Sequence, residues 1–97
     1  MATYVFNKGE ISPYTKYTRG DFLVDAEIVG RVIQRVREDR KQSQELVSGL
    51  AGIGRTHLSA IERGVRKPTL DTFVRIAEAM GIRPSMLLAE IELEMEK

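Results

Sequence analysis

Apolar residues recur at intervals of three and four along residues 25–97, and this spacing restricts the fold more than any other feature of the sequence. The pattern is clearest near its start, where Val29, Val32, Ile33 and Val36 fall on one side of a helix. No strand is needed to explain residues 25–97. The spacing therefore predicts an all-α fold.

Capping residues and glycines divide the pattern into five helices. Asp25, Ser43 and Thr69 are good N-caps, whereas Gly52 and Gly81 can adopt the left-handed conformation that ends a helix. The expected helices cover residues 25–40, 43–51, 55–63 and 69–80, with a fifth from Pro84 onward. The residues expected to face the core in the second, third and fourth helices are Val47, Leu50, Ala51, Leu58, Ile61, Leu70, Phe73, Ile76, Ala77 and Met80.

Length and composition limit the class of protein. Ninety-seven residues with 42% apolar content suit one compact domain with modest extensions. Because the chain has no cysteine, disulfides and thiolate metal sites are excluded. The longest apolar run is four residues, Met86 to Ala89, and the amino terminus does not have the layout of a secretion signal. We expect a soluble cytoplasmic protein with no cofactor.

The net charge of +1 hides a segregated distribution. Residues 1–24 carry a net charge of +1, residues 25–83 carry +3 and residues 84–97 carry −3. Within residues 54–67, the basic residues Arg55, Arg63, Arg66 and Lys67 accompany one acid, Glu62. This local positive patch is either a solvated helix end or a surface for an anionic partner.

The chain's one histidine lies in the stretch "GIGRTHLSAIERG", close to a serine and a glutamate. At 100° per residue, however, His57 and Ser59 point about 160° apart on the expected helix. A nucleophile and its base must come within hydrogen-bonding distance, so these residues do not form a hydrolytic site. One histidine and no cysteine also give no metal-ligand pattern. We therefore expect neither an enzyme nor a metal protein.

The outward face of helix 55–63 suits nucleic acid instead. Its small residues would allow close approach to a DNA groove, and arginines at its edges could contact bases or phosphates. A short helix joined to it by a glycine-containing turn gives the layout of a helix-turn-helix. The residues on this face are Arg55, Thr56, Ser59, Ala60 and Arg63.

The stretch "SQELVSGLAGIGRTHLSAIERGVRKPTLDTFVRIAEAMGI" resembles the Cro and phage-repressor type of helix-turn-helix domain, the Xre-like family, over residues 28–88. The resemblance implies that Arg55, Thr56, Ser59 and Ala60 contact bases. It also implies that Gln44 contacts a phosphate and supports the first base-contacting side chain. The other expected phosphate contacts are His57, Arg63, Arg66 and Lys67.

In relatives of this type, the glutamate of the "ERG" motif pairs with an arginine of the first helix. The resemblance therefore implies a pair between Glu62 and Arg37, the alternative being two unconnected surface charges. Two residues depart from the family pattern. Ser48 replaces the usual alanine between the motif helices, and Gly54 replaces the usual serine or threonine cap.

The two ends of the chain lie outside this resemblance. Residues 1–24 are rich in aromatics, which leads us to expect an arm that packs on its own domain or on a partner chain. One alternative is a loosely attached tail. Another is an arm that contacts DNA through Lys8, Lys16 and Arg19. The sequence "TYVF", with Tyr4 and Phe6, could pair as a strand across a dimer. Near the other end, an apolar stripe predicts either a dimer surface or a helix that folds onto its own core. Its residues are Leu88, Ile91 and Met95.

Together these features predict a homodimeric repressor of transcription that binds the major groove at an inverted repeat. The competing hypothesis is an antitoxin-like interaction module that binds a partner protein and regulates its own operon. The expected architecture is an N-terminal arm, residues 1–24, followed by a five-helix Cro/phage-repressor-like bundle, residues 25–97.

Overall fold

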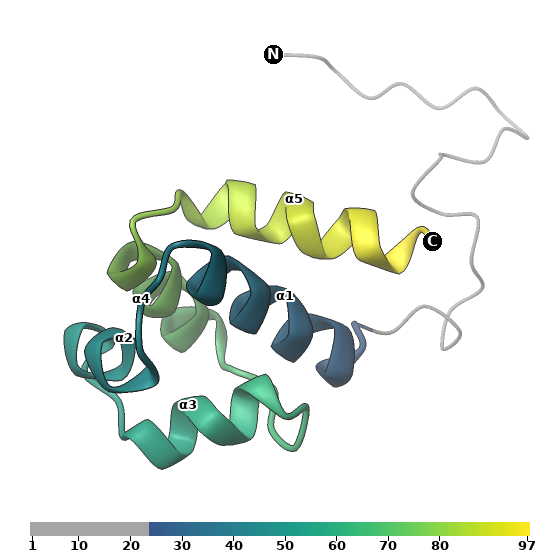
Figure 1. Ribbon diagram of the computed structural model, residues 1–97. Coiled ribbons are helices and arrows are strands. Elements are labelled where there is room, and N and C mark those ends of the chain that lie inside the picture. The colour runs from purple at the N-terminus through teal and green to yellow at the C-terminus, as the bar shows by residue number, and fades with distance from the viewer. Residues whose placement is uncertain (1–23) are drawn as a thin grey trace, which may run out of the picture.

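The computed structural model describes residues 24–97, and Figure 1 shows their arrangement. Five helices follow one another: α1 (Ala26–Asp39), α2 (Gln44–Ala51), α3 (Arg55–Glu62), α4 (Leu70–Met80) and α5 (Pro84–Met95). No strand occurs in this part of the chain. The all-α, five-helix prediction is therefore confirmed. The proposed strand at Tyr4 and Phe6 lies outside the described residues.

Local hydrogen bonds place the helix ends close to where the sequence predicts them. The side chain of Asp25 accepts a hydrogen bond from the Glu27 N–H at 2.8 Å, and Ser43 caps α2 in the same way. At the other end of α2, Gly52 adopts a left-handed conformation with a φ of 71°. Because an L side chain is strained in that conformation, glycine suits the tight turn between α2 and α3.

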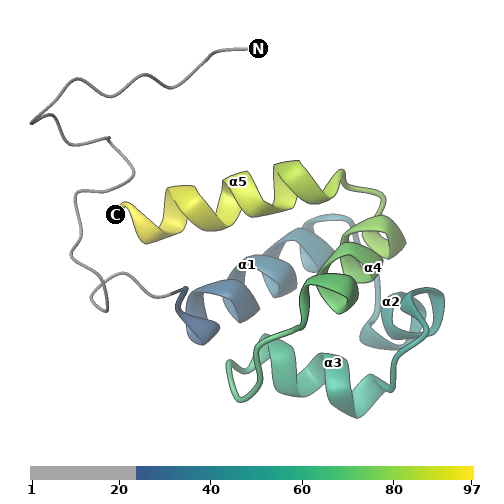
Figure 2. The same cartoon turned by 180° about the vertical axis from the view of Figure 1, so that it is seen from behind.

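The helices enclose one hydrophobic core. Helices α1 and α5 lie side by side and antiparallel, α4 packs against α2, and α3 crosses below α1 in both views (Figures 1 and 2). The fully buried side chains include Ile33, Leu58, Ile61, Ile76, Met80 and Leu87.

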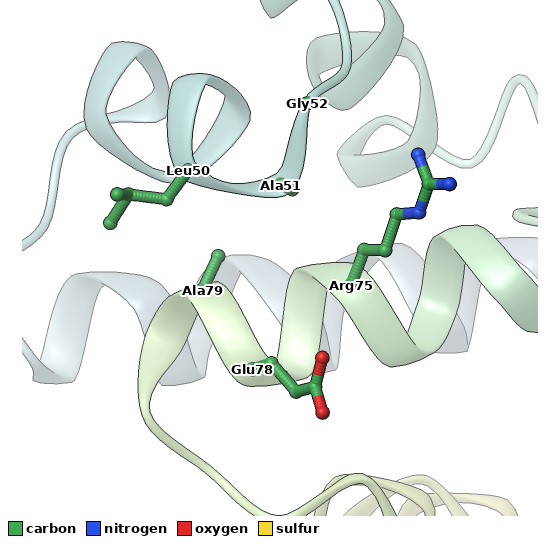
Figure 3. Close-up of a pocket in the computed structure, with 6 residues that line it drawn as sticks. All are labelled: Leu50, Ala51, Gly52, Arg75, Glu78 and Ala79. Carbon is green, nitrogen blue, oxygen red and sulfur yellow. The ribbon is translucent and has the colours of Figure 1, made fainter.

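Two residues expected in this core lie outside it. Leu50 is 65% exposed and Leu70 is 79% exposed. Figure 3 shows Leu50 beside a hollow between α2 and α4 that is also lined by Arg75, Glu78 and Ala79. The helical repeat assigned both leucines to a buried stripe, but no described helix packs closely enough to bury them.

One close backbone contact sets the distance between α1 and α3. Gly30 is buried in α1, and a β-carbon at this position would lie 2.3 Å from the carbonyl oxygen of Ile61. No side chain fits at that separation. Because glycine has no β-carbon, the two helix backbones can touch. The helix that bears the expected base contacts is thereby held against α1.

Helix α5 is apolar on two sides. Its inner side, with Leu87 and Ile91, is buried in the core. The expectation that Ile91 belongs to a dimer surface is wrong, because this side chain is 2% exposed within the single chain. Met95 is partly buried against the same core, so the stripe serves mainly to fold α5 back onto its own domain. On the outer side, Met86 and Leu93 are 58% and 57% exposed.

Candidate nucleic-acid interface

Helix α3 lies at one edge of the molecule, and no other described helix covers its outer side in either view (Figures 1 and 2). Its inner side is fixed by Leu58 and Ile61, both 0% exposed. This burial turns the remaining side of α3 toward solvent. The tight turn at Gly52 joins α3 to α2, which completes a helix-turn-helix.

The structure places the four expected base-contacting residues together on that outer side. Arg55 and Thr56 are exposed in the first turn of α3, and Ser59 and Ala60 are half-buried one turn later. His57 is half-buried at the flank. The helix thus presents a long cation at its start and small side chains along its middle, a shape that permits close approach to a groove.

The amino terminus of α3 keeps its backbone donors available. Gly54 is the N-cap and supplies no side-chain hydrogen bond, in contrast to Ser43 at the start of α2. The first N–H groups of a helix point outward and carry a partial positive charge. An anion such as a phosphate can therefore be bound at this end.

A basic loop follows α3 and is tied to it by backbone hydrogen bonds. The carbonyl oxygen of Ala60 accepts from the N–H groups of Val65 and Arg66 at 2.9 and 3.3 Å. Gly64 permits the turn with a φ of 77°, and a β-carbon there would lie 2.9 Å from Cα of Glu27. Three basic side chains are exposed here: Arg63, Arg66 and Lys67. Arg63 is the C-cap of α3, so it stands just after the helix.

A buried network connects α3 to α1 and α2. Both carboxylate oxygens of Glu62 accept hydrogen bonds from Arg37, at 2.7 Å from Nε and 2.9 Å from Nη2. Gln44, at the start of α2, donates to the same carboxylate at 2.9 Å. The hydrogen bond with Glu62 raises the pKa of the Arg37 guanidinium, against the opposing effect of burial. The network therefore links three helices through one carboxylate.

This contact of Gln44 is the part of the site that sequence reasoning missed. The amide nitrogen of Gln44 donates to Glu62, whereas the resemblance implied support for the first base-contacting side chain. The position of Gln44 at the first turn of α2 was visible in the sequence, but its distance to a residue 18 positions away was not.

The network also determines the charge that the surface presents. Glu62, the one acid of residues 54–67, is 4% exposed and has its charge balanced by Arg37. Among the ion pairs formed within residues 24–97, none involves Arg55, Arg63, Arg66 or Lys67. These four side chains therefore form a positive surface, which we call the basic surface, beside the outer side of α3.

Within residues 24–97, no group of three or more histidine, aspartate and glutamate side chains is placed to hold a metal ion. None of the five described helices is long and apolar enough to cross a bilayer.

A family model described as Helix-turn-helix matches residues 33–87, more than half of the chain. The chain belongs to the helix-turn-helix family. Its resemblance to Xre-like regulators is thereby confirmed, and the family is one of DNA-binding transcription regulators rather than of enzymes.

Two curated relatives show the range of this helix-turn-helix family. The chain is 35% identical over 69 residues to the immunity repressor protein of Bacillus phage phi105, with 71% of this chain and 48% of the repressor covered. It therefore spans about half the length of that repressor. It is 34% identical over 62 residues to control protein C.BamHI of Bacillus amyloliquefaciens, covering 63% of this chain and 76% of that protein.

A solved structure gives the same arrangement of helices. The restriction-modification controller protein C.AhdI from Aeromonas hydrophila superimposes with a TM-score of 0.63 and 29% sequence identity. The superposition covers 67% of this chain and 98% of the controller.

Proposed function

We propose that the protein is a sequence-specific transcriptional repressor that binds double-stranded DNA as a homodimer. The observation that carries this proposal is the outer side of α3, which is uncovered, bordered by the basic surface and fixed in place by the buried Arg37–Glu62 pair. In a DNA groove, the hydrogen-bond donors and acceptors of the base edges lie between two rows of phosphates. The outer side of α3 suits the base edges, and the basic surface suits the phosphates.

In this proposal α3 enters the major groove. Arg55 donates two hydrogen bonds to a guanine, and Thr56, Ser59 and Ala60 contact the neighbouring base edges. Gln44, His57, Arg63, Arg66 and Lys67 contact phosphates, together with the free N–H groups at the start of α3. Glu62 does not contact DNA, because its carboxylate is already used within the protein.

The homodimer is proposed to form through the outer side of α5. Met86 and Leu93 lie seven residues apart, two turns along one side of this helix, and both are more than half exposed. A two-fold axis through such a stripe would pair it with itself. The two copies of α3 would then meet half-sites about one helical turn, roughly 34 Å, apart on an inverted repeat.

The assignment as a repressor is supported by the name of the phage relative, an immunity repressor. A dimer bound over a promoter would exclude polymerase by occupying the same DNA. We propose that the protein acts on DNA in the cytoplasm.

The deciding experiment is selection of binding sites from random duplex DNA by the full chain, followed by measurement of the mass of the bound complex. We expect an inverted repeat bound by two copies. If no sequence is enriched, the proposal fails; if an asymmetric site is bound by one copy, the dimer part of it fails.

The dimer surface can be tested without DNA. Leu93→Asp places a charge on the outer side of α5 and should convert the dimer to a monomer in analytical ultracentrifugation. Leu50→Asp changes another exposed leucine, on α2, and should leave the mass unchanged. Equal masses for Leu93→Asp and the unaltered chain would assign the dimer to another surface.

A further inference from the structure

An apolar groove lies where the start of α1, the start of α4 and the middle of α5 meet. Its volume is about 290 Å³, and Phe73 and Ile91 form its buried floor. Val24, Leu70 and Leu88 line it as well, with exposed fractions of 43%, 79% and 48%. Three large apolar side chains are thus left in water around one hollow. Exposed apolar side chains gathered around a hollow are a candidate binding surface.

We propose that this groove binds the aromatic segment that precedes α1 in the same chain, with Phe22 as its leading side chain. Val24, the first described residue, is itself part of the groove lining. Phe22 is two residues upstream, so it can be at most roughly 7 Å of chain away. The segment therefore starts at the groove and needs no long linker to reach it.

The composition of the segment fits an apolar groove. Of the six aromatic residues in the chain, five precede Leu23. The sixth, Phe73, lies in the groove floor. Aromatic rings pack favourably edge to face, and each buries a large apolar area. The five upstream aromatics are Tyr4, Phe6, Tyr14, Tyr17 and Phe22.

The charges near the groove agree with this occupant. Lys67 is the charged residue among those lining the groove, and Asp21 immediately precedes Phe22 in the sequence. With Phe22 in the groove, the Asp21 carboxylate would be near the lysine ammonium at the rim. Lys67 and Pro68 would also gain a packed neighbour, which links the segment to the loop that carries part of the basic surface.

A second copy of the chain fits the groove less well than this segment. A two-fold interface pairs the same surface on both copies, so a hollow on the axis would face another hollow. The projecting side chains Met86 and Leu93 are better suited to that role and lie on the opposite side of α5 from Ile91. A tethered segment, in addition, is present at an effective concentration in the millimolar range.

The absence of tryptophan from the chain allows a direct test with the full-length protein. Phe22→Trp introduces one fluorophore at the proposed anchor. If the ring enters the groove, its emission maximum lies at shorter wavelength than that of free tryptophan, acrylamide quenches it weakly, and both properties are unchanged on dilution. Emission like that of free tryptophan overturns the proposal, and a return to such emission on dilution assigns the groove to a second copy.

Paired substitutions identify the groove as the binding surface. In the Phe22→Trp chain, Leu88→Asp should shift the emission to longer wavelength and raise acrylamide quenching. Leu46→Asp, at an equally exposed leucine on α2 that does not line the groove, should do neither. Equal effects of the two substitutions overturn the proposal. Helix content by circular dichroism confirms that each variant is folded.

A second measurement avoids the larger indole ring. Because the chain has no cysteine, Asp21→Cys with Leu70→Cys creates one defined pair beside the anchor and leaves Phe22 in place. A short bis-maleimide should link the pair within one chain, giving a product of monomer mass. A linked product of dimer mass, or no linkage, contradicts the proposal. Neither measurement involves DNA, so its failure is distinguishable from failure of the proposed function.

Discussion

Arg37 and Glu62 are 25 positions apart in the sequence, yet two guanidinium nitrogens of Arg37 contact both carboxylate oxygens of Glu62, at 2.7 and 2.9 Å. Both residues are at least nine-tenths buried. A paired geometry of this kind fixes orientation as well as distance. The pair therefore sets how α3 lies on α1, and with it the direction in which the outer side of α3 faces.

Replacing Glu62 by glutamine should destabilise the fold by about 3 kcal/mol, because the change leaves the buried Arg37 charge without a counter-charge. The free energy of unfolding in urea measures this effect. Glu38→Gln is the matched control, since its exposed carboxylate lies 4.0 Å from Arg37. That variant should differ from the unaltered protein by less than about 0.5 kcal/mol. Similar losses for the two variants would contradict the assigned role of Glu62.

The contact between the α1 and α3 backbones predicts opposite effects for two glycines. Gly30→Ala should cost about 1–3 kcal/mol, because the new methyl group would overlap the Ile61 carbonyl oxygen and push the helices apart. Gly49 also lies within a helix, but a β-carbon there meets nothing within 4 Å. Gly49→Ala should therefore stabilise the protein by up to about 1 kcal/mol through helix propensity. Thermal unfolding of both variants compares them, and a stable Gly30→Ala protein would refute the close-contact argument.

Arg55 is proposed to contact a base, so its removal should change specificity. Arg55→Ala should weaken binding to the selected site by about 1–3 kcal/mol and relax the preference at one position of each half-site. Competition binding against a set of single-base variants measures both effects. Arg83→Ala removes another exposed arginine, at the start of α5, and should change neither. An equal loss on selected and random DNA for Arg55→Ala would exclude a base contact.

Lys67 is proposed to contact a phosphate, which predicts a different result. Lys67→Ala should weaken binding to selected and random DNA alike, because phosphates carry no sequence information. The slope of log affinity against log salt concentration should become shallower by about 1 for each lost contact. Titrations at several salt concentrations measure that slope, and an unchanged slope would place Lys67 away from the DNA.

The carboxyl-terminal turn of α5 should respond to acid. The hydrogen bond from Lys97 lowers the pKa of Glu94 below its ordinary value of 4.5, and Arg35 acts in the same direction. Because the folded state favours the charged carboxylate, its stabilising effect is present above that ordinary value and is lost as the pH falls through the lowered one.

Chemical shifts of residues 92–96, followed by NMR from about pH 6 to about pH 2.5, should show the helix end fraying only in the acidic part of the range. Glu94→Gln should remove this dependence, whereas Glu92→Gln, at an exposed position, should retain it. A Glu94→Gln profile equal to that of the unaltered protein would contradict the prediction.

The five helices and most of their ends were predictable from the sequence because the interactions that form them are local. Asp25, Ser43 and Thr69 accept hydrogen bonds from backbone N–H groups two or three residues ahead. Gly52 and Gly81 adopt the left-handed conformation that their lack of a side chain permits. The pair Arg37 and Glu62 came from the family resemblance, and its buried geometry came from the structure.

What the tertiary structure decided was which neighbours each helix side meets. Leu50, Leu70 and Ile91 all follow helical spacing, yet two are exposed and the third is buried. An apolar repeat of three and four residues gives the direction of each side chain around the helix axis. It does not show which element, if any, packs against that side. The same holds for the Gln44 contact with Glu62, for the touching backbones at Gly30 and for the groove beside Val24. The sequence by itself determined the helices and the residues of the basic surface. The tertiary structure decided that this surface is positive, because a contact between distant segments buries the one nearby acid, Glu62, against Arg37.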